Sequence, residues 1–187
     1  LLGIQGMNYI IPLITLPYLV RTLGPVGYGS LGFSLAIIQY FCLLTDYGFN
    51  LSVTRQIAVI KDNKNKVSEL FWNILSCKLI LAILSLIILC FATVLSKQLQ
   101  NILPVVVSAY GMVLGNVLFP SWLFQGKESM GWIAIANIAA RLSAVPLIFI
   151  FVNSSTDVWV AAFITGITSI IAGIIGLWFI YRQEWIC

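Results

Sequence analysis

Six long apolar runs follow one another along this chain of 187 residues, and they restrict its fold more than any other feature. A helix of about 20 mostly apolar residues crosses the hydrocarbon core of a bilayer. The chain is 60% hydrophobic and 9% charged, whereas soluble domains are about 45–50% apolar and about 25% charged. A soluble globule of this size could not bury so much apolar surface. The sequence therefore predicts an integral membrane protein.

The predicted fold class is all-α, a polytopic membrane helix bundle with six transmembrane helices. Helices are favoured because an open-ended segment in lipid must satisfy its backbone hydrogen bonds internally, and because strands of a barrel would appear as alternating segments of about 10 residues. The whole chain, 1–187, is interpreted as a single transmembrane lobe. The expected helices are 1–20, 31–54, 71–95, 102–124, 132–152 and 158–181.

Glycine patterns mark turns and close packing. Gly24-Pro25 separates the first two runs. The stretch Gly27–Gly32 matches GxGxxG, but a dinucleotide site requires a preceding strand, and here a membrane helix precedes it. We interpret it as a tight interfacial turn. Gly111 and Gly115 form a GxxxG pair, which is typical of closely packed membrane helices.

Basic residues predict the orientation, because Lys and Arg are enriched in cytoplasmic loops. With the N-terminus inside, the cytoplasmic side carries six basic residues and the opposite side two. We therefore expect both ends of this segment to be cytoplasmic. The six are Arg55, Lys61, Lys64, Lys66, Lys127 and Arg182, and the two are Arg21 and Lys97.

Three charged residues fall inside the apolar runs: Asp46, Lys78 and Arg141. An intramembrane charge costs about 2.5–3.5 kcal/mol on insertion scales, so it indicates function by default. All three are predicted to lie about 10–14 Å from the inner boundary, at 1.5 Å per residue. They are expected to meet in one layer and to line a wet, cationic cavity that favours a phosphate or pyrophosphate group.

Neutral polar residues accompany these charges. Gln39, Cys42, Asp46 and Asn50 follow helical spacing on one face, and Asn137 precedes Arg141 by four residues. A structural alternative stays open. Asp46 would then simply pair with Arg141 or Lys78, and Lys78 would extend to the inner surface. The candidate substrate-binding residues are Arg141, Lys78, Asp46, Gln39, Asn50, Asn116 and Asn137.

The sequence predicts no catalytic chemistry, no cofactor and no metal site. It contains no histidine, and its cysteines form no CxxC pair. It also has no close carboxylate pair. Ten basic residues spread along the chain do not form a patch for nucleic acid.

Three stretches resemble the bacterial polysaccharide (O-antigen, Wzx-type) flippases of the multidrug/oligosaccharidyl-lipid/polysaccharide exporter superfamily. They are Pro17–Pro25 with Gly27-Tyr28-Gly29, Leu44–Ser52 with Thr54-Arg55, and Gly115–Pro120 with Trp122–Gly126. The resemblance extends from about residue 5 to residue 180, and it is the combination of the stretches that makes it specific.

The resemblance implies one lobe of a two-lobed transporter, the N-terminal half, with the second lobe missing. Such proteins move undecaprenyl-pyrophosphate-linked oligosaccharide units across the bacterial inner membrane. The implied partners are this lipid-linked substrate, membrane lipids and other polysaccharide-assembly proteins. Arg141 and Lys78 would hold the pyrophosphate, and the amide side chains would hydrogen-bond sugars.

Two other functions fit the same residues. In a cation-coupled multidrug exporter of the same superfamily, Asp46 would be the main proton or sodium site. In a non-transporting membrane scaffold, the polar stripes would join helices to one another. Water-soluble thiol reagents that fail to reach the stripe residues would favour the scaffold.

Overall fold

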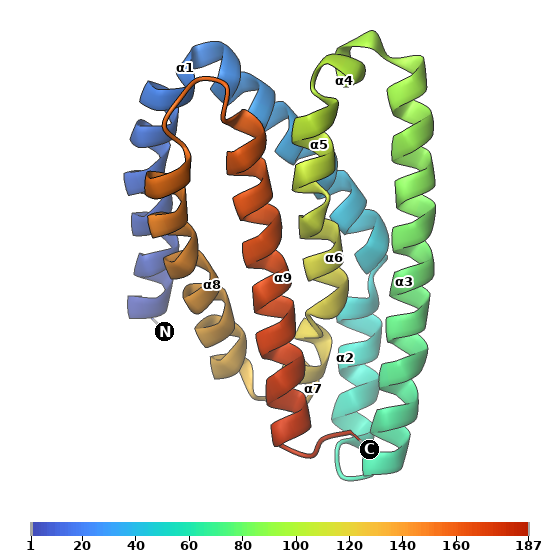
Figure 1. Ribbon diagram of the computed structural model, residues 1–187. Coiled ribbons are helices and arrows are strands. Elements are labelled where there is room, and N and C mark those ends of the chain that lie inside the picture. Colours follow the sequence, from blue (N-terminus) through green and yellow to red (C-terminus); the bar gives the residue numbers. More distant parts are fainter. Residues whose placement is uncertain (1, 187) are drawn as a thin grey trace.

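The chain folds into a bundle of long helices (Figure 1), and the residues that the structure describes include no strand. The computed structural model describes the backbone of residues 2–186 and the side chains of residues 13–186. Leu1, where the first predicted helix begins, lies outside the described residues. The all-α prediction is confirmed. The helices are α1 (Leu2–Asp46), α2 (Phe49–Ile60), α3 (Lys64–Leu95), α4 (Lys97–Asn101), α5 (Leu103–Ala109), α6 (Gly111–Leu118), α7 (Ser121–Gly126), α8 (Met130–Phe151) and α9 (Val158–Arg182).

Five helical stretches within the described residues are long and apolar enough to cross a membrane: Leu13–Ile60, Lys64–Leu95, Leu103–Gly126, Met130–Phe151 and Val158–Arg182. The first stretch, of 48 residues, combines the first two predicted helices. At about 1.5 Å per residue, its length measured along the helical path is about 72 Å, more than twice the roughly 30 Å thickness of the hydrocarbon core. The count of six separate spanning helices stays a prediction.

A bend at Gly24 divides α1 into two arms that meet at the top of Figure 1. Gly24 has φ 70° and ψ 172°, a conformation that residues with a Cβ rarely adopt. The Gly24-Pro25 break is therefore where the sequence predicts it. The interfacial turn predicted for Gly27–Gly32 is wrong, because these residues are helical and follow Pro25 in the second arm. Proline is favoured in the first turn of a helix.

Besides the gap at Tyr110 between α5 and α6, two further breaks interrupt helices that the sequence predicts to be continuous. The predicted helix 31–54 is broken at Tyr47 and Gly48, which have φ 33° and 80°. The predicted helix 102–124 is broken between α6 and α7, at Phe119 and Pro120. Proline lacks the amide hydrogen that a continuous helix needs, and this explains the second break.

The helices also extend further toward the lower end of Figure 1 than the apolar runs indicate. α2 reaches Ile60, and α3 begins at Lys64. Asn63 caps α3, because its side chain accepts a hydrogen bond from the Lys66 amide at 3.2 Å. An apolar run marks the part of a helix in lipid, whereas the helix itself continues into the polar interface.

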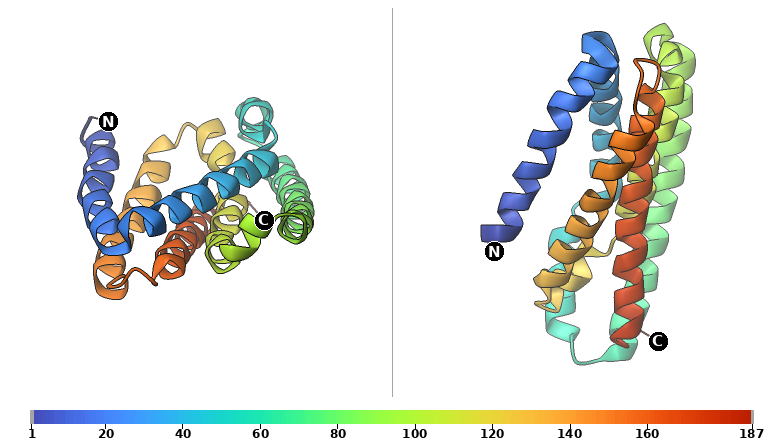
Figure 2. Two further views of the ribbon diagram at one scale, coloured as in Figure 1. Left: turned by 90° about the horizontal axis from the view of Figure 1, so that it is seen from above. Right: turned by 60° about the vertical axis from the view of Figure 1, so that its left-hand side comes forward.

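Many apolar side chains face outward, unlike those of a soluble bundle, and several polar ones are buried. On α3, Ile80, Ile83 and Ile87 are exposed, whereas Lys78 and Ser85 are buried. An outward apolar face needs lipid around it. In Figure 2, α3 stands at one edge of the bundle and the first arm of α1 at the other, beside α8.

Buried apolar residues form two separate clusters. The upper core gathers residues of α1, α5, α6, α8, α9 and the upper part of α3, among them Ile38, Val113 and Ala162. The lower core gathers residues of α2, α7 and the lower parts of α3 and α9, among them Ile57 and Trp122. The breaks after Asp46 and Leu118 fall between the two clusters.

α6 packs closely against α9, as the GxxxG pair predicts. A Cβ on Gly111 would lie 2.9 Å from the Cα of Gly166, and a Cβ on Gly115 would overlap the backbone of Ser169. One turn further, a Cβ on Gly173 would lie 2.7 Å from the Cβ of Leu118. Glycine at these positions lets the two backbones approach each other.

Candidate functional site

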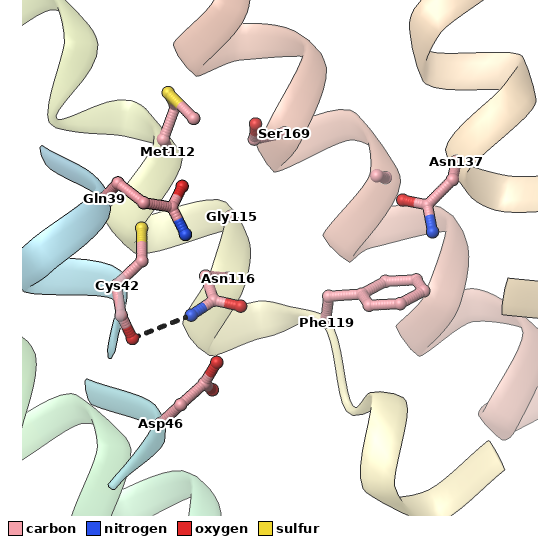
Figure 3. Close-up of a pocket in the computed structure, with 10 residues that line it drawn as sticks. Gln39, Cys42, Asp46, Met112, Gly115, Asn116, Phe119, Asn137 and Ser169 are labelled. Atoms are coloured by element: carbon pink, nitrogen blue, oxygen red, sulfur yellow. Dashed lines mark hydrogen bonds between the residues drawn. The ribbon is translucent and has the colours of Figure 1, made fainter. Parts of the chain in front are cut away.

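A polar pocket of about 220 Å³ opens at the level where α1 and α6 end (Figure 3). Residues from α1, α6, α8 and α9 surround it, together with Phe119 in the break after α6. Most of its side chains are polar or small, although it lies within an apolar bundle. The lining residues are Gln39, Cys42, Asp46, Met112, Gly115, Asn116, Phe119, Asn137, Ser169 and Ala172.

Four of the seven predicted site residues line this pocket: Gln39, Asp46, Asn116 and Asn137. They come from three helices that are far apart in the sequence, so the fold brings together what the sequence only places along helix faces. In Figure 3, Gln39, Asp46 and Asn116 lie on one side, and Asn137 lies across the pocket from them.

Asp46 is bound by Lys78 of α3. The ammonium of Lys78 donates a hydrogen bond to Oδ1 of Asp46 at 2.7 Å, and the two groups form an ion pair. The side chain of Lys78 is 1% exposed, whereas that of Asp46 is 24% exposed. The carboxylate therefore faces the pocket, and the ammonium lies behind it. The prediction that these two charges meet is confirmed.

The position of the pair follows from the ends of the helices. Asp46 is the last residue of α1, where the helix dipole places partial negative charge that a cation stabilises. Asp46 lies 14 residues before Ile60, and Lys78 lies 14 residues after Lys64. Both therefore lie at a similar number of residues from the lower end of the bundle, so the ends of α1 and α2 and the length of α3 bring them to one level. Their depth in the bilayer stays a prediction.

Two hydrogen bonds orient the polar groups beside the ion pair. Nδ2 of Asn116 donates to the carbonyl of Cys42 at 3.3 Å, which leaves the amide oxygen of Asn116 available. The hydroxyl of Ser169 donates to the carbonyl of Thr165 at 3.0 Å, and its oxygen can still accept a hydrogen bond.

Asn50 lies apart from these residues. The helix breaks after Asp46, so Asn50 does not continue the face of Gln39, Cys42 and Asp46 as the spacing predicts. Its Oδ1 instead accepts a hydrogen bond from the hydroxyl of Ser121 at 2.8 Å. Asn50 thus joins α2 to α7, and the expectation that it lies on the same stripe is wrong.

Arg141 lies on α8, four residues after Asn137, and is exposed. It is not among the described residues that line the pocket. At about 1.5 Å per residue, it lies about 6 Å further along the helix than Asn137. The structure therefore brings Asp46 and Lys78 together, and Arg141 lies about one helical turn from Asn137 without being among the described residues that line the pocket.

Sequence reasoning did not assign Phe119, Met112 and Ser169 to the site. Ser169 could have been noticed as a polar residue in an apolar span, one that α6 approaches through Gly115. Phe119 has no sequence signal of its own, because it reaches the pocket only through the break before Pro120.

The pocket offers hydrogen-bonding groups of both kinds and one carboxylate, which suits binding rather than covalent chemistry. Among the residues that the structure describes, no three His, Cys, Asp or Glu side chains gather where they could hold a metal ion. The outward apolar helices and this inward polar pocket define a multi-pass helical membrane protein.

The chain belongs to the family described as "Polysaccharide biosynthesis protein", whose model matches residues 1–186. Two relatives carry the name "Putative O-antigen transporter". One, from Escherichia coli (strain K12), is 42% identical over 183 residues, which are 98% of this chain and 44% of the relative. The other, from Shigella dysenteriae, is 33% identical over 182 residues, which are 97% of this chain and 46% of the relative.

The chain therefore spans less than half the length of these curated relatives. No solved structure matches it significantly. Family membership confirms the resemblance of the stretches around Pro17–Pro25, Leu44–Ser52 and Gly115–Pro120 to polysaccharide flippases.

Proposed function

We propose that this chain is one lobe of a flippase that moves undecaprenyl-pyrophosphate-linked oligosaccharide units across the bacterial inner membrane, for O-antigen or capsule biosynthesis. The observation that carries the proposal is the polar pocket lined by Gln39, Asp46, Asn116 and Asn137 inside a bundle whose outer face is apolar. The names of its relatives support polysaccharide as the cargo.

The pocket has the properties that a transport site for a glycolipid requires. Sugar hydroxyls both donate and accept hydrogen bonds, and the amides of Gln39, Asn116 and Asn137 do the same. The breaks after Asp46 and Leu118 also flank the pocket. Interrupted helices around a site within the membrane are common in transporters that work by alternating access.

The charged residues take different roles in this proposal. Arg141, which is exposed on α8, binds the pyrophosphate, because a guanidinium forms two parallel hydrogen bonds with phosphate oxygens. Lys78 acts through Asp46, because its ammonium is almost fully buried against that carboxylate. Asn50 acts by joining α2 to α7. Transport requires no covalent step, so we propose that the protein is not an enzyme.

The proposed orientation places both ends of this chain in the cytoplasm. Basic residues concentrate at the lower end of Figure 1: in α2, at the start of α3 and in the segment between them, directly after α7, and at the end of α9. The upper end carries Arg21 and Lys97. This asymmetry supports a cytoplasmic lower end. A second lobe would complete the cavity, and other polysaccharide-assembly proteins would supply and receive the cargo.

Replacing Arg141 by alanine is expected to reduce surface polysaccharide strongly. A hydrogen bond to a charged group contributes about 1.5–3 kcal/mol, so affinity for the pyrophosphate should fall about ten- to a hundredfold. The measurement is surface O-antigen, by gel and antibody, in a strain that carries only the variant gene. Protein abundance in the membrane is measured in the same cells.

Arg182→Ala is the matched control. Arg182 is also an exposed arginine, but it lies at the end of α9 with its guanidinium 5.2 Å from the Trp178 ring. This variant should retain normal surface polysaccharide. Normal polysaccharide in the Arg141→Ala strain, at normal protein abundance, would remove the proposed role of Arg141.

A cation-coupled multidrug exporter is the second candidate, and one observation favours it: the carboxylate of Asp46 faces the pocket. A cationic drug would bind next to that carboxylate. Lys78, however, already neutralises it at 2.7 Å. Efflux of ethidium from cells that lack other exporters separates the two functions, since a polysaccharide flippase should leave ethidium retention unchanged.

A further inference from the structure

We infer that the pocket between α1, α6, α8 and α9 binds one uncharged sugar ring and excludes negatively charged groups, with Asp46 as the residue that sets this specificity. The inference rests on the proposed function and names the part of the substrate that enters the pocket. The sequence pattern had instead indicated a cationic cavity for phosphate.

The pocket faces the negative end of an ion pair. Of the described residues that line it, Asp46 is the one that is charged at neutral pH. Lys78 does not line the pocket, and its side chain is 1% exposed behind the carboxylate that it binds. The ion pair is therefore a dipole whose negative end faces the pocket. In a low-dielectric site, the negative end of this dipole repels phosphate and uronate groups more strongly than it would in water.

The neutral lining groups suit a sugar. The Asn116 amide donates one hydrogen bond to the carbonyl of Cys42 at 3.3 Å, so its oxygen is free to accept one from a hydroxyl. Gln39, Asn137 and Ser169 add further donors and acceptors around the pocket. The carboxylate of Asp46 accepts from hydroxyls as well. Figure 3 shows the ring of Phe119 between the polar groups, where it offers an apolar face to the C–H side of a sugar ring.

The volume limits how much of the substrate can enter. At about 220 Å³, the pocket is smaller than the roughly 300–1,000 Å³ of sites for drug-sized ligands. The part of the cavity that this chain lines therefore suits a single ring of the substrate. Arg141 lies about one helical turn beyond Asn137 on α8, so pyrophosphate joined to that ring would bind outside the pocket.

The experiment measures occupation of the pocket directly, by protection of a thiol. Met112→Cys places a reporter in the lining of the pocket of the intact protein, from which the other cysteines have been removed. The reporter reacts with a water-soluble thiol reagent in membranes. Ile87→Cys is the control, because Ile87 faces outward on α3 and should not react.

Three probes are compared at matched ionic strength: N-acetylglucosamine, glucuronic acid and inorganic pyrophosphate. N-acetylglucosamine should slow modification of the reporter, by about threefold at twice its dissociation constant, because the free fraction falls as 1/(1 + [L]/Kd). Glucuronic acid and pyrophosphate should leave the rate unchanged. Equal protection by either anion, or no protection by the neutral sugar, overturns the inference.

A paired variant tests the role of Asp46. Asp46→Asn combined with Lys78→Gln removes both charges and retains side chains that can hydrogen-bond each other. Glucuronic acid should now protect the reporter as well as N-acetylglucosamine does. Continued exclusion of glucuronic acid by a folded double variant would show that Asp46 does not set the specificity.

Different results would contradict the inference about the sugar and the proposed transport function. Protection by pyrophosphate alone would overturn the sugar assignment and leave a lipid-linked oligosaccharide as the cargo. Normal surface polysaccharide in both Asn116→Ala and Asn137→Ala cells would instead remove the pocket from transport, whichever probe protects the reporter.

Discussion

Lys78→Met is expected to destabilise the folded protein by about 3–5 kcal/mol, the usual cost of removing one partner of a buried ion pair. The substitution leaves Asp46 at the end of α1 without the ammonium that binds it at 2.7 Å. It also leaves the negative end of the α1 dipole without a cation. The measurement is unfolding in mixed detergent micelles, followed by tryptophan fluorescence.

Two comparisons show whether the loss comes from the ion pair. Lys97→Met also removes a lysine, but from the exposed segment that follows α3, and it should change stability little. Asp46→Asn combined with Lys78→Met should cost less than Lys78→Met alone, because no unpaired charge is left in the bundle. Equal losses in the single and double variants would show that the charges do not stabilise each other.

Gly115→Ala is expected to destabilise the folded protein by about 1–3 kcal/mol, the typical cost of overpacking a core. The added Cβ would overlap the backbone of Ser169, and a backbone cannot rotate away as a side chain can. α6 and α9 would have to separate. Since Asn116 follows Gly115 directly and Ser169 lines the same pocket, the separation should also reduce transport.

Gly32→Ala is the matched control for this substitution. Gly32 is helical, and a Cβ at this position would meet nothing within 4 Å. Alanine is about 1 kcal/mol more favourable than glycine in a helix, so Gly32→Ala should be neutral or slightly stabilising. Unfolding in mixed micelles measures both variants. A Gly115→Ala protein as stable as the parent would mean that the α6–α9 contact can widen without cost.

The sequence was sufficient to predict the bundle, because hydrophobic length and charge determine what can lie in a bilayer. The Gly24-Pro25 break carries a local signal, and it is where we expected it. The break at Tyr47 and Gly48 lies inside an apolar run, and the run itself gives no signal of it. α2 below the break packs against α7, and contacts between distant segments do not leave a pattern along the chain.

The candidate site was predicted in part, for a related reason. Helical spacing placed Gln39 and Asp46 on one face, and the cost of a buried charge indicated a partner for Asp46. Spacing alone cannot predict which of the two charged groups faces the pocket. The structure places the Asp46 carboxylate toward the pocket and the Lys78 ammonium behind it, so the pocket faces the negative end of the ion pair and not the cationic lining that we expected.

The two breaks beside the pocket also bear on how the bundle can deform. At that level, α1 and α2 are separated by Tyr47 and Gly48, and α6 and α7 by Phe119 and Pro120. A continuous helix resists bending because its hydrogen-bond ladder must stretch, but these two connections have no continuous ladder there. At this level, the resistance of the bundle to bending therefore comes from α3, α8 and α9. The part of the bundle below the pocket can tilt relative to the part above it, with the two breaks as the hinge.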